Sequence, residues 1–242
     1  MIRTLIYLFI LATLACFFTG CAIFRKVDPE VEHIVTDIDG NVYPVVLTGE
    51  QEWLGENLRV TRYRNGDHIP GIISGNEWYQ AEHGAYSKYD GADLGSTAIY
   101  GKLYNWYAVT DKRGLCPSGW HVPADSEWKQ LEIYLGLTPG EADEYGARGT
   151  DEGGKLKKQG TEYWNSPNEG ATNETGFSAL PGGYVGGFYF IGLFGSWWTA
   201  TEIHELNAWS RLLDHYTAKI YRLSNDKREG FSVRCVRDKS KD

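Results

Sequence analysis

The side chains that could do chemistry are dispersed along this 242-residue chain rather than grouped by spacing. Its six histidines stand at positions 33, 68, 83, 121, 204 and 215, without the short separations that metal ligands usually show. The serine-nucleophile pattern GxSxG, the zinc pattern HExxH and a CxxC pair do not occur. We therefore predict no catalytic site, no resident metal and no cofactor.

Two of the histidines are candidates of different kinds. His204 lies close to Glu202 and Glu205, so it is the best placed of the six to act as an acid or a base. His121 lies between two apolar residues, and we expect its side chain to be buried, hydrogen-bonded and structural. Neither prediction identifies an active site.

An acidic run near the start of the domain could hold calcium. Asp37, Asp39 and Asn41 alternate as in the first half of an EF-hand loop, which continues with a glycine after the third ligand and a glutamate at the twelfth position. Here Gly40 precedes Asn41, and the twelfth position is Thr48. We interpret the run as a hairpin turn and keep calcium binding as the alternative.

The first residues are typical of an export signal. Arg3 is followed by an apolar run and then by the sequence FTGC, which resembles the bacterial lipobox except that Phe18 replaces the usual leucine. We predict a lipoprotein signal peptide over 1–21, a lipid on Cys21 and a tether over 22–33. The lipid then anchors the mature protein to a membrane of the bacterial envelope, with the domain outside the cytoplasm, at the outer membrane or cell surface. An uncleaved anchor is the alternative, because the run is only slightly shorter than a spanning helix.

The four cysteines divide by position. Cys16 is lost with the signal and Cys21 carries the lipid, so Cys116 and Cys235 remain in the mature domain. An exported protein meets an oxidising compartment, and we expect these two to form a disulfide. Closing so long a loop should stabilise the fold by about 4 to 5 kcal/mol.

Composition indicates one extracytoplasmic domain of roughly 220 residues and excludes a nucleic-acid partner. The formal charge of −8 is the wrong sign for binding phosphates. The basic run over residues 155–159 is interpreted as a solvated face. Glycine, tryptophan and tyrosine are abundant, which favours a loop-rich fold packed by aromatic side chains.

The pattern of residues predicts one domain over 34–238. A hairpin is expected from Val42–Leu47 and Gln51–Leu54, with Pro44 at a sheet edge or strand end. A helix should begin after Ala124, since Glu127 can complete a capping box, and should stop at Gly136. Further predictions are a helix over 99–110, an exposed loop over 136–160, short strands over 163–201, and antiparallel strands over 208–213, 219–223 and 230–236.

Seven sequence blocks, in order, carry a family resemblance. They are DIDGNVY from Asp37, WLGENL from Trp53, YGKLYNWYA from Tyr100, LCPSGWHVP from Leu115, GFSALPGG from Gly176, WWTATE from Trp197 and FSVRCV from Phe231. The chain thereby resembles the Fibrobacter succinogenes major paralogous domain family. The resemblance implies an α+β, C-type-lectin-like fold, in which two short helices flank a mostly antiparallel, loop-rich sheet.

The same resemblance raises an enzymatic alternative. The fold is similar to that of formylglycine-generating enzymes, in which two nearby cysteines carry copper and the oxidation. Those thiols would have to be additional to a structural bridge, and the mature domain retains only Cys116 and Cys235. We therefore disfavour an oxidoreductase of that type.

A binding function depends on aromatic and polar residues in the long loops. Aromatic faces pack against sugar rings or protein partners, while amides and carboxylates satisfy hydroxyl groups. The candidate ligand-binding residues are Trp164, Asn168, Asn173, Tyr184, Phe188, Tyr189 and His204. We predict non-enzymatic binding of a glycan or a protein at the cell surface. Packing inside the fold is the alternative for the aromatics, and a purely structural envelope component is the alternative for the protein.

Overall fold

The computed structural model describes residues 34–72, 74–87, 94–185 and 190–238. The predicted export signal 1–21, including Cys21, and the tether 22–33 lie outside these ranges, as do Phe188 and Tyr189. None of the helices in the described ranges is long and apolar enough to cross a membrane.

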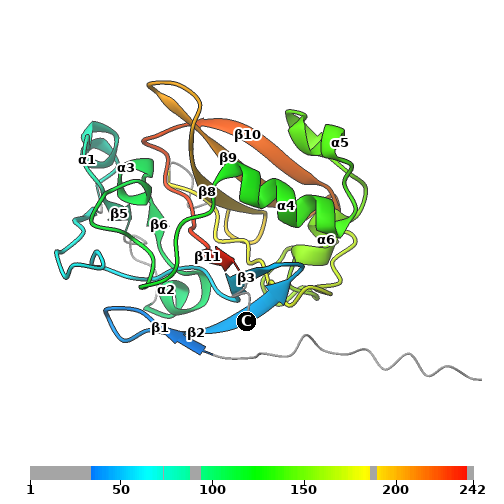
Figure 1. Ribbon diagram of the computed structural model, residues 1–242, viewed down its shortest axis with the longest axis horizontal. Coiled ribbons are helices and arrows are strands. Elements are labelled where there is room, and N and C mark those ends of the chain that lie inside the picture. Colours follow the sequence, from blue (N-terminus) through cyan, green and yellow to red (C-terminus); the bar gives the residue numbers. More distant parts are fainter. Residues whose placement is uncertain (1–33, 73, 88–93, 186–189, 239–242) are drawn as a thin grey trace, which may run out of the picture.

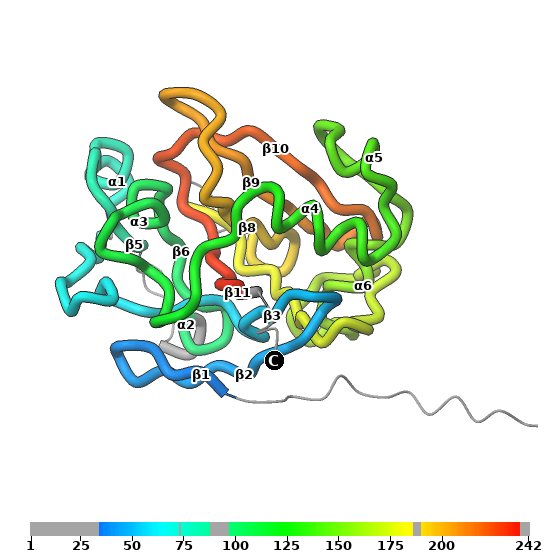
Figure 2. Tube along the Cα trace, in the orientation of Figure 1, coloured from blue at the N-terminus to red at the C-terminus, as the bar shows by residue number. Residues whose placement is uncertain are grey.

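The first sheet joins the two ends of the described chain. In spatial order its strands are β1 (Ile34–Thr36), β2 (Val42–Thr48), β3 (Gln51–Leu54) and β11 (Val236–Asp238). All three pairings are antiparallel, so the last strand lies beside the hairpin near the start of the domain (Figure 1, Figure 2). The predicted hairpin of β2 and β3 is confirmed.

Asp37 shapes the turn between β1 and β2. Its Oδ1 accepts hydrogen bonds from the backbone N–H groups of Asp39 and Asn41, both at 2.9 Å. Pro44 lies in an inner strand, which corrects the predicted sheet edge. The proline is accommodated because it stands opposite Ile34, where the pairing with β1 ends and the pairing with β3 has not yet begun.

The second sheet is the larger body of antiparallel structure. Its order is β7 (Gly146–Arg148), β10 (Ile220–Asp226), β9 (Asn207–Asp214) and β8 (Phe194–Glu202). The strands predicted over 208–213 and 219–223 are confirmed. The strand predicted over 230–236 is wrong for most of its length, because this segment crosses between the sheets and makes only isolated bridges before β11 begins.

Two smaller features complete the strand structure. A third sheet has the order β4 (Gly71–Ile72), β5 (Tyr86–Ser87) and β6 (Leu103–Tyr104), and its β4–β5 pairing is parallel. Between residues 163 and 201, where we predicted several short strands, the described part contains only β8 as a named strand, and the glycine-rich turns otherwise form isolated bridges. The fold is α+β with mostly antiparallel sheets.

The helix predicted after Pro123 is confirmed. It is α4 (Asp125–Leu135), and the Glu127 carboxylate accepts the Ala124 backbone N–H at 2.7 Å, which is the half of a capping box that needs no side-chain oxygen at the N-cap. Gly136 ends the helix with a φ of 136°. The other described helices are α1 (Gly75–Gln80), α2 (Leu94–Tyr100), α3 (Trp106–Val109), α5 (Pro139–Asp143) and α6 (Glu152–Leu156).

The single helix predicted over 99–110 is wrong. The chain leaves α2 at Gly101, whose φ is 78°, and Lys102 donates its N–H to the carbonyl of Leu58 at 3.0 Å. The next two residues form β6, and the side chain of Asn105 then caps α3 by accepting the Ala108 N–H at 3.1 Å. Contacts to distant segments therefore outweigh the helical periodicity of this stretch.

Two aromatic-rich clusters form most of the core. One lies under α4, where the ring centroids of Trp53 and Trp128 are 5.0 Å apart and Phe177 packs against both. The other surrounds the disulfide between Cys116 and Cys235, which joins the turn before α4 to the segment before β11. The predicted disulfide is confirmed, and both of its residues are buried.

Buried ion pairs bind α4 to the second sheet. Asp125, in the first turn of α4, contacts Arg211 of β9 at 2.8 Å and Arg222 of β10 at 2.9 Å. Glu132, two turns later, contacts Arg211 and also Arg148 of β7, the latter at 2.7 Å. Although burial opposes ionisation, the two guanidinium groups at Asp125 hold the pKa of its carboxyl well below its usual range.

Two predictions of exposure are corrected. In the stretch 136–160, the residues around α6 are buried, and Lys157 donates from Nζ to three backbone carbonyls, those of Glu169, Asp214 and Thr217. These carbonyls satisfy the ammonium group, while burial lowers the pKa of Lys157 to about 8. His121 is the opposite case, since half of its side chain is exposed and Nε2 lies 2.6 Å from the Glu127 carboxylate.

Candidate functional site

A pocket of about 230 Å³ opens on the face of the second sheet opposite the buried arginines. We call it the Glu229 pocket, and it is lined by Tyr184, Ser196, Ser210, Leu212, Leu223, Asn225, Glu229 and Phe231. Side chains two residues apart on a strand share one face of a sheet. This period places Ser210 and Leu212 of β9 in the pocket, while Arg211 between them reaches α4.

The register of the strands brings the polar groups of this face together. Ser196 of β8 is paired with Leu212, and Ser210 is paired with Leu223 of β10. The Ser210 hydroxyl lies 2.7 Å from Oδ1 of Asn225. Within the described ranges, the amide nitrogen of Asn225 has no acceptor, so it can donate to a bound molecule.

Glu229 enters the pocket from the turn after β10. One carboxylate oxygen, Oε2, is buried and has no hydrogen-bond partner among the described residues. Burial, together with the negative charge of Asp226, raises the pKa of Glu229 to about 7. Arg228 opposes this shift only weakly, because its guanidinium pairs with the Asp226 carboxylate at 2.5 Å. Near neutral pH the Glu229 carboxyl can therefore either donate or accept a hydrogen bond.

Aromatic rings form one wall of the pocket. Tyr184 is half-buried, and its ring stacks on Phe190 with centroids 5.3 Å apart and an interplanar angle of 8°. Phe231 meets the Tyr184 ring edge-on at 6.3 Å and packs on Trp198 below. The Tyr184 ring is thus held in place by its neighbours. The pocket combines a carboxyl, an amide and two hydroxyls with an ordered aromatic wall.

The residues predicted to bind a ligand are not gathered in one place. Trp164 is buried and donates its indole N–H to the carbonyl of Ala179 at 2.9 Å. Asn168 is buried and donates to two backbone carbonyls, and the amide of Asn173 bonds to both the backbone N–H and the hydroxyl of Ser178. In this structure these three side chains hold the loop between α6 and β8. Of the predicted ligand-binding residues that the structure describes, Tyr184 is the one that lines the Glu229 pocket.

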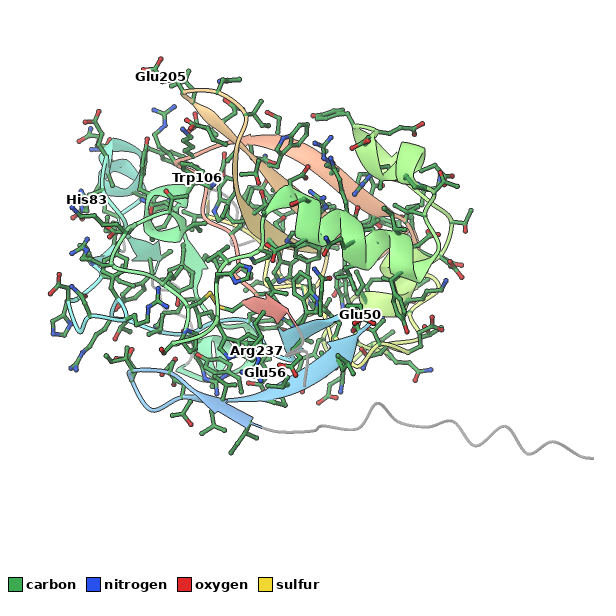
Figure 3. All side chains as sticks on the ribbon, viewed as in Figure 1. Glu50, Glu56, His83, Trp106, Glu205 and Arg237 are labelled. Carbon is green, nitrogen blue, oxygen red and sulfur yellow. A yellow bond between two sulfur atoms is a disulfide. The ribbon has the colours of Figure 1, made fainter. Side chains whose placement is uncertain are left out.

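His204 is not among the lining residues of the pocket. It lies between β8 and β9, next in sequence to Glu205, which Figure 3 labels. It is exposed, and its Nδ1 accepts the backbone N–H of Leu206 at 3.3 Å. Phe188 and Tyr189 follow Tyr184 in the chain but lie outside the described residues. Among the predicted residues the structure therefore supports Tyr184 as part of a pocket.

Sequence reasoning missed Glu229, Ser210 and Asn225. The alternation of Ser210 with Leu212 was readable within the strand predicted over 208–213. Asn225 lies beyond the strand predicted over 219–223, because β10 continues to Asp226. What the sequence did not show is the pairing that places these strands side by side.

The raised pKa of Glu229 predicts a pH-dependent penalty on stability. The pKa is about 4.5 without the fold and about 7 within it, so the folded state holds the proton more tightly and wild-type stability falls as the pH rises between these values. Glu229→Gln should therefore be more stable than wild type by about 1 to 3 kcal/mol at pH 8. Urea unfolding of the two proteins at pH 8 and at pH 4.5 measures this difference in the free energy of unfolding. The difference should nearly vanish at pH 4.5.

The matched control for that measurement is Glu174→Gln, because Glu174 is exposed and lies in a loop outside the pocket. Its free energy of unfolding should differ from wild type by less than about 0.5 kcal/mol at either pH. A Glu229→Gln variant that is no more stable than wild type at pH 8 would show that the carboxylate is well solvated in the folded state.

The structure thus defines a disulfide-stapled α+β domain with mostly antiparallel sheets and one polar, aromatic-walled pocket on its largest antiparallel sheet. The family model of the Fibrobacter succinogenes major domain matches residues 46–237, and the chain belongs to this family. The match spans the domain from β2 to β11 and includes every residue that lines the pocket. Searches of curated proteins and of solved structures found no significant match.

Proposed function

We propose that this protein is a lipoprotein of the cell envelope whose domain binds a glycan in the Glu229 pocket without changing it chemically. The observation that carries the proposal is the buried Glu229 Oε2, which has no hydrogen-bond partner among the described residues and lies in a pocket that also offers an amide, two serine hydroxyls and the Tyr184 ring. A buried polar atom without a partner lowers stability, so its presence in a pocket favours a role with a ligand.

A sugar is the ligand class that matches this combination of groups. Each sugar hydroxyl both donates and accepts hydrogen bonds, and Glu229 and Asn225 supply acceptors and donors at close quarters. The apolar face of a sugar ring can pack on the Tyr184 ring, which its neighbours already hold in position. A pocket of about 230 Å³ suits one terminal sugar residue better than a protein surface.

The disulfide supports a non-enzymatic role over a formylglycine-generating one. Oxidation of that type requires reactive thiols, and both Cys116 and Cys235 are used in the bridge. Asp226, the carboxylate that acts on Glu229 among the described residues, is paired with Arg228 and is therefore not free to act as the second group of an acid–base pair. The C-type-lectin-like fold remains part of the proposal and rests on the family resemblance of the seven sequence blocks.

The lipid anchor completes the proposal. Cys21, preceded by Thr-Gly and an apolar run, is the expected site of lipidation, and the short tether that follows keeps the domain close to the membrane. A domain held at the outer membrane or cell surface meets glycans of its own envelope and of its surroundings.

A glycan-binding screen followed by titration tests the proposal. We expect a neutral oligosaccharide to bind, and Tyr184→Ala to weaken that binding about tenfold through loss of ring packing. Asn225→Ala should weaken it by a similar factor through loss of a hydrogen bond. The control is Tyr134→Ala, because Tyr134 is exposed on α4 and lies outside the pocket. This variant should bind the oligosaccharide with the affinity of wild type.

Three results would count against glycan binding in this pocket. Equal glycan affinities for Tyr184→Ala and Tyr134→Ala would show that the Tyr184 ring does not contact the glycan. A screen in which only a protein ligand is retained would replace a glycan by a protein partner. A screen that retains nothing would favour a purely structural envelope component.

A further inference from the structure

Arg234, the arginine of the FSVRCV block, is buried in an unusual environment. Only 1% of the residue is exposed, and its guanidinium is bonded entirely to neutral groups. Nε and Nη2 donate to Oδ1 of Asn57 at 3.2 and 2.9 Å, and Nη1 donates to the carbonyls of Leu54 and Phe177 at 3.0 and 2.5 Å. A guanidinium has five N–H donors, so one N–H on Nη2 has no acceptor among the described residues.

The positive charge of Arg234 has no counter-ion among the described residues. No carboxylate there lies within 4.0 Å of its nitrogens, although the buried arginines 148, 211 and 222 all have one. Glu56 acts on it electrostatically, but the Glu56 carboxylate pairs with Arg59 at 2.6 Å. Burial lowers the pKa of Arg234 to about 9. A buried cation without a paired anion is costly to the fold.

Arg234 also lines a pocket of about 360 Å³, which we call the Arg234 pocket. It lies between the segment after β3, the end of α2 and the loop after α6. Glu56, one of its lining residues, is labelled in Figure 3. Its polar lining residues are Glu56, Asn57, Lys158, Tyr163, Ser178 and Arg234. It shares no lining residue with the Glu229 pocket, so the two sites are independent.

Two further groups in the Arg234 pocket can bind an anion. Lys158 is half-buried at the pocket and, within the described ranges, has no carboxylate within 4.0 Å. The Ser178 oxygen accepts a hydrogen bond from Nδ2 of Asn173 at 2.9 Å, and its own hydroxyl hydrogen has no described acceptor. Ser178 is held in the left-handed region, with a φ of 52°, by a second bond from its N–H to the Asn173 side chain.

We propose that the Arg234 pocket binds a small organic carboxylate of the size of a uronic acid, with its anionic group against Arg234, Lys158 and Ser178. The charge balance favours a monoanion, because Glu56 lines the same pocket as the two cations and its carboxylate would repel a dianion such as phosphate. The walls formed by Pro44, Val46, Ile99 and Leu180 are apolar and can pack against the rest of the molecule.

Calorimetric titration of the purified protein at fixed ionic strength tests the proposal. The ligands are glucuronate, its neutral counterpart methyl glucoside, and inorganic phosphate. We expect glucuronate to bind and the other two to bind at least about tenfold more weakly. Lys158→Gln should weaken glucuronate binding by about tenfold, and this variant is expected to fold because the Lys158 side chain makes no described ion pair.

Two variants serve as controls. Lys112→Gln changes an exposed lysine outside the pocket and should bind glucuronate as wild type does. Glu229→Gln alters the other pocket and should also leave this affinity unchanged. Equal affinities for Lys158→Gln and Lys112→Gln would overturn the proposal, as would a preference for phosphate. Equal binding of methyl glucoside would overturn it if that binding persists in Tyr184→Ala, because it then does not come from the Glu229 pocket. If Glu229→Gln alone loses glucuronate binding, the ligand binds in the Glu229 pocket. That result would also overturn the proposal.

Discussion

Replacing both Cys116 and Cys235 by alanine is expected to lower the free energy of unfolding by about 4 to 5 kcal/mol. The two cysteines are 119 residues apart in sequence, so the bridge removes much of the freedom of the unfolded chain. It also ties the turn before α4 to the segment that leads into β11. Because domains are stable by only about 5 to 15 kcal/mol, this loss is a large fraction of the total.

Urea unfolding of the double variant and of wild type, with and without a reducing agent, measures this contribution. Reduced wild type should unfold at nearly the same urea concentration as the double variant. Ser118→Ala, an exposed change close to Cys116, is the control and should shift stability by less than about 0.5 kcal/mol. A double variant within about 1 kcal/mol of wild type would mean that the core around the bridge holds without it.

Arg211→Met is expected to destabilise the domain by about 3 to 5 kcal/mol. Arg211 is fully buried and pairs with both Asp125 and Glu132, so its loss leaves two buried carboxylates short of a partner. Methionine keeps much of the side-chain volume, which separates the effect of charge from that of a cavity. The loss should be smaller below about pH 4, where the Asp125 carboxyl becomes protonated in the unfolded state, because the arginines hold its pKa below the usual range in the folded wild type and that contribution to stability is lost as the pH falls.

The control for this variant is Arg62→Met, because Arg62 is exposed and its contact with Asp39 is long, at 3.6 Å. That change should alter the free energy of unfolding by at most about 1 kcal/mol. A double-mutant cycle with Glu132→Leu then isolates the pair, and we expect a coupling of about 1 to 3 kcal/mol. Equal stabilities for Arg211→Met and Arg62→Met would show that water reaches the carboxylates.

Local signals explain why some elements could be predicted. The start and end of α4 are specified by residues within one turn of each end, namely Ala124 with Glu127 and the C-cap Gly136. The β2–β3 hairpin follows from alternation and a Thr-Gly turn. The Cys116–Cys235 bridge followed from counting cysteines in an exported chain.

The errors arose where distant contacts decide the local structure. The stretch 99–110 has helical periodicity, but Lys102 binds the carbonyl of Leu58, and residues 103–104 join a sheet. The basic run that contains Lys157 predicts a solvated face. In the structure its ammonium group instead donates to three carbonyls from two other segments. His121 looked buried between apolar neighbours, yet a bridge to Val236 turns its side chain toward Glu127 and solvent.

The candidate site was predictable only in part for the same reason. The position of Tyr184 in a long loop correctly predicts a pocket residue. The same reasoning predicts Trp164 and Asn168, whose side chains instead hydrogen-bond to backbone carbonyls and stabilise the loop. Glu229 stands next to Arg228 in sequence, which suggests a neutral pair. In space Arg228 pairs with Asp226, and the Glu229 carboxyl is left in the pocket.

By itself the sequence determined the family, the disulfide, the first hairpin, the principal helix and two strands of the second sheet, because each depends on short-range patterns or on residue counts. The tertiary structure decided which charges are buried and which pockets form. Strand register places Ser210 beside Leu223 and Arg211 beneath α4, and the crossing of the last segment places Arg234 against Asn57. The physical reason is that desolvation and pairing depend on neighbours far apart in the chain, and no local pattern contains them.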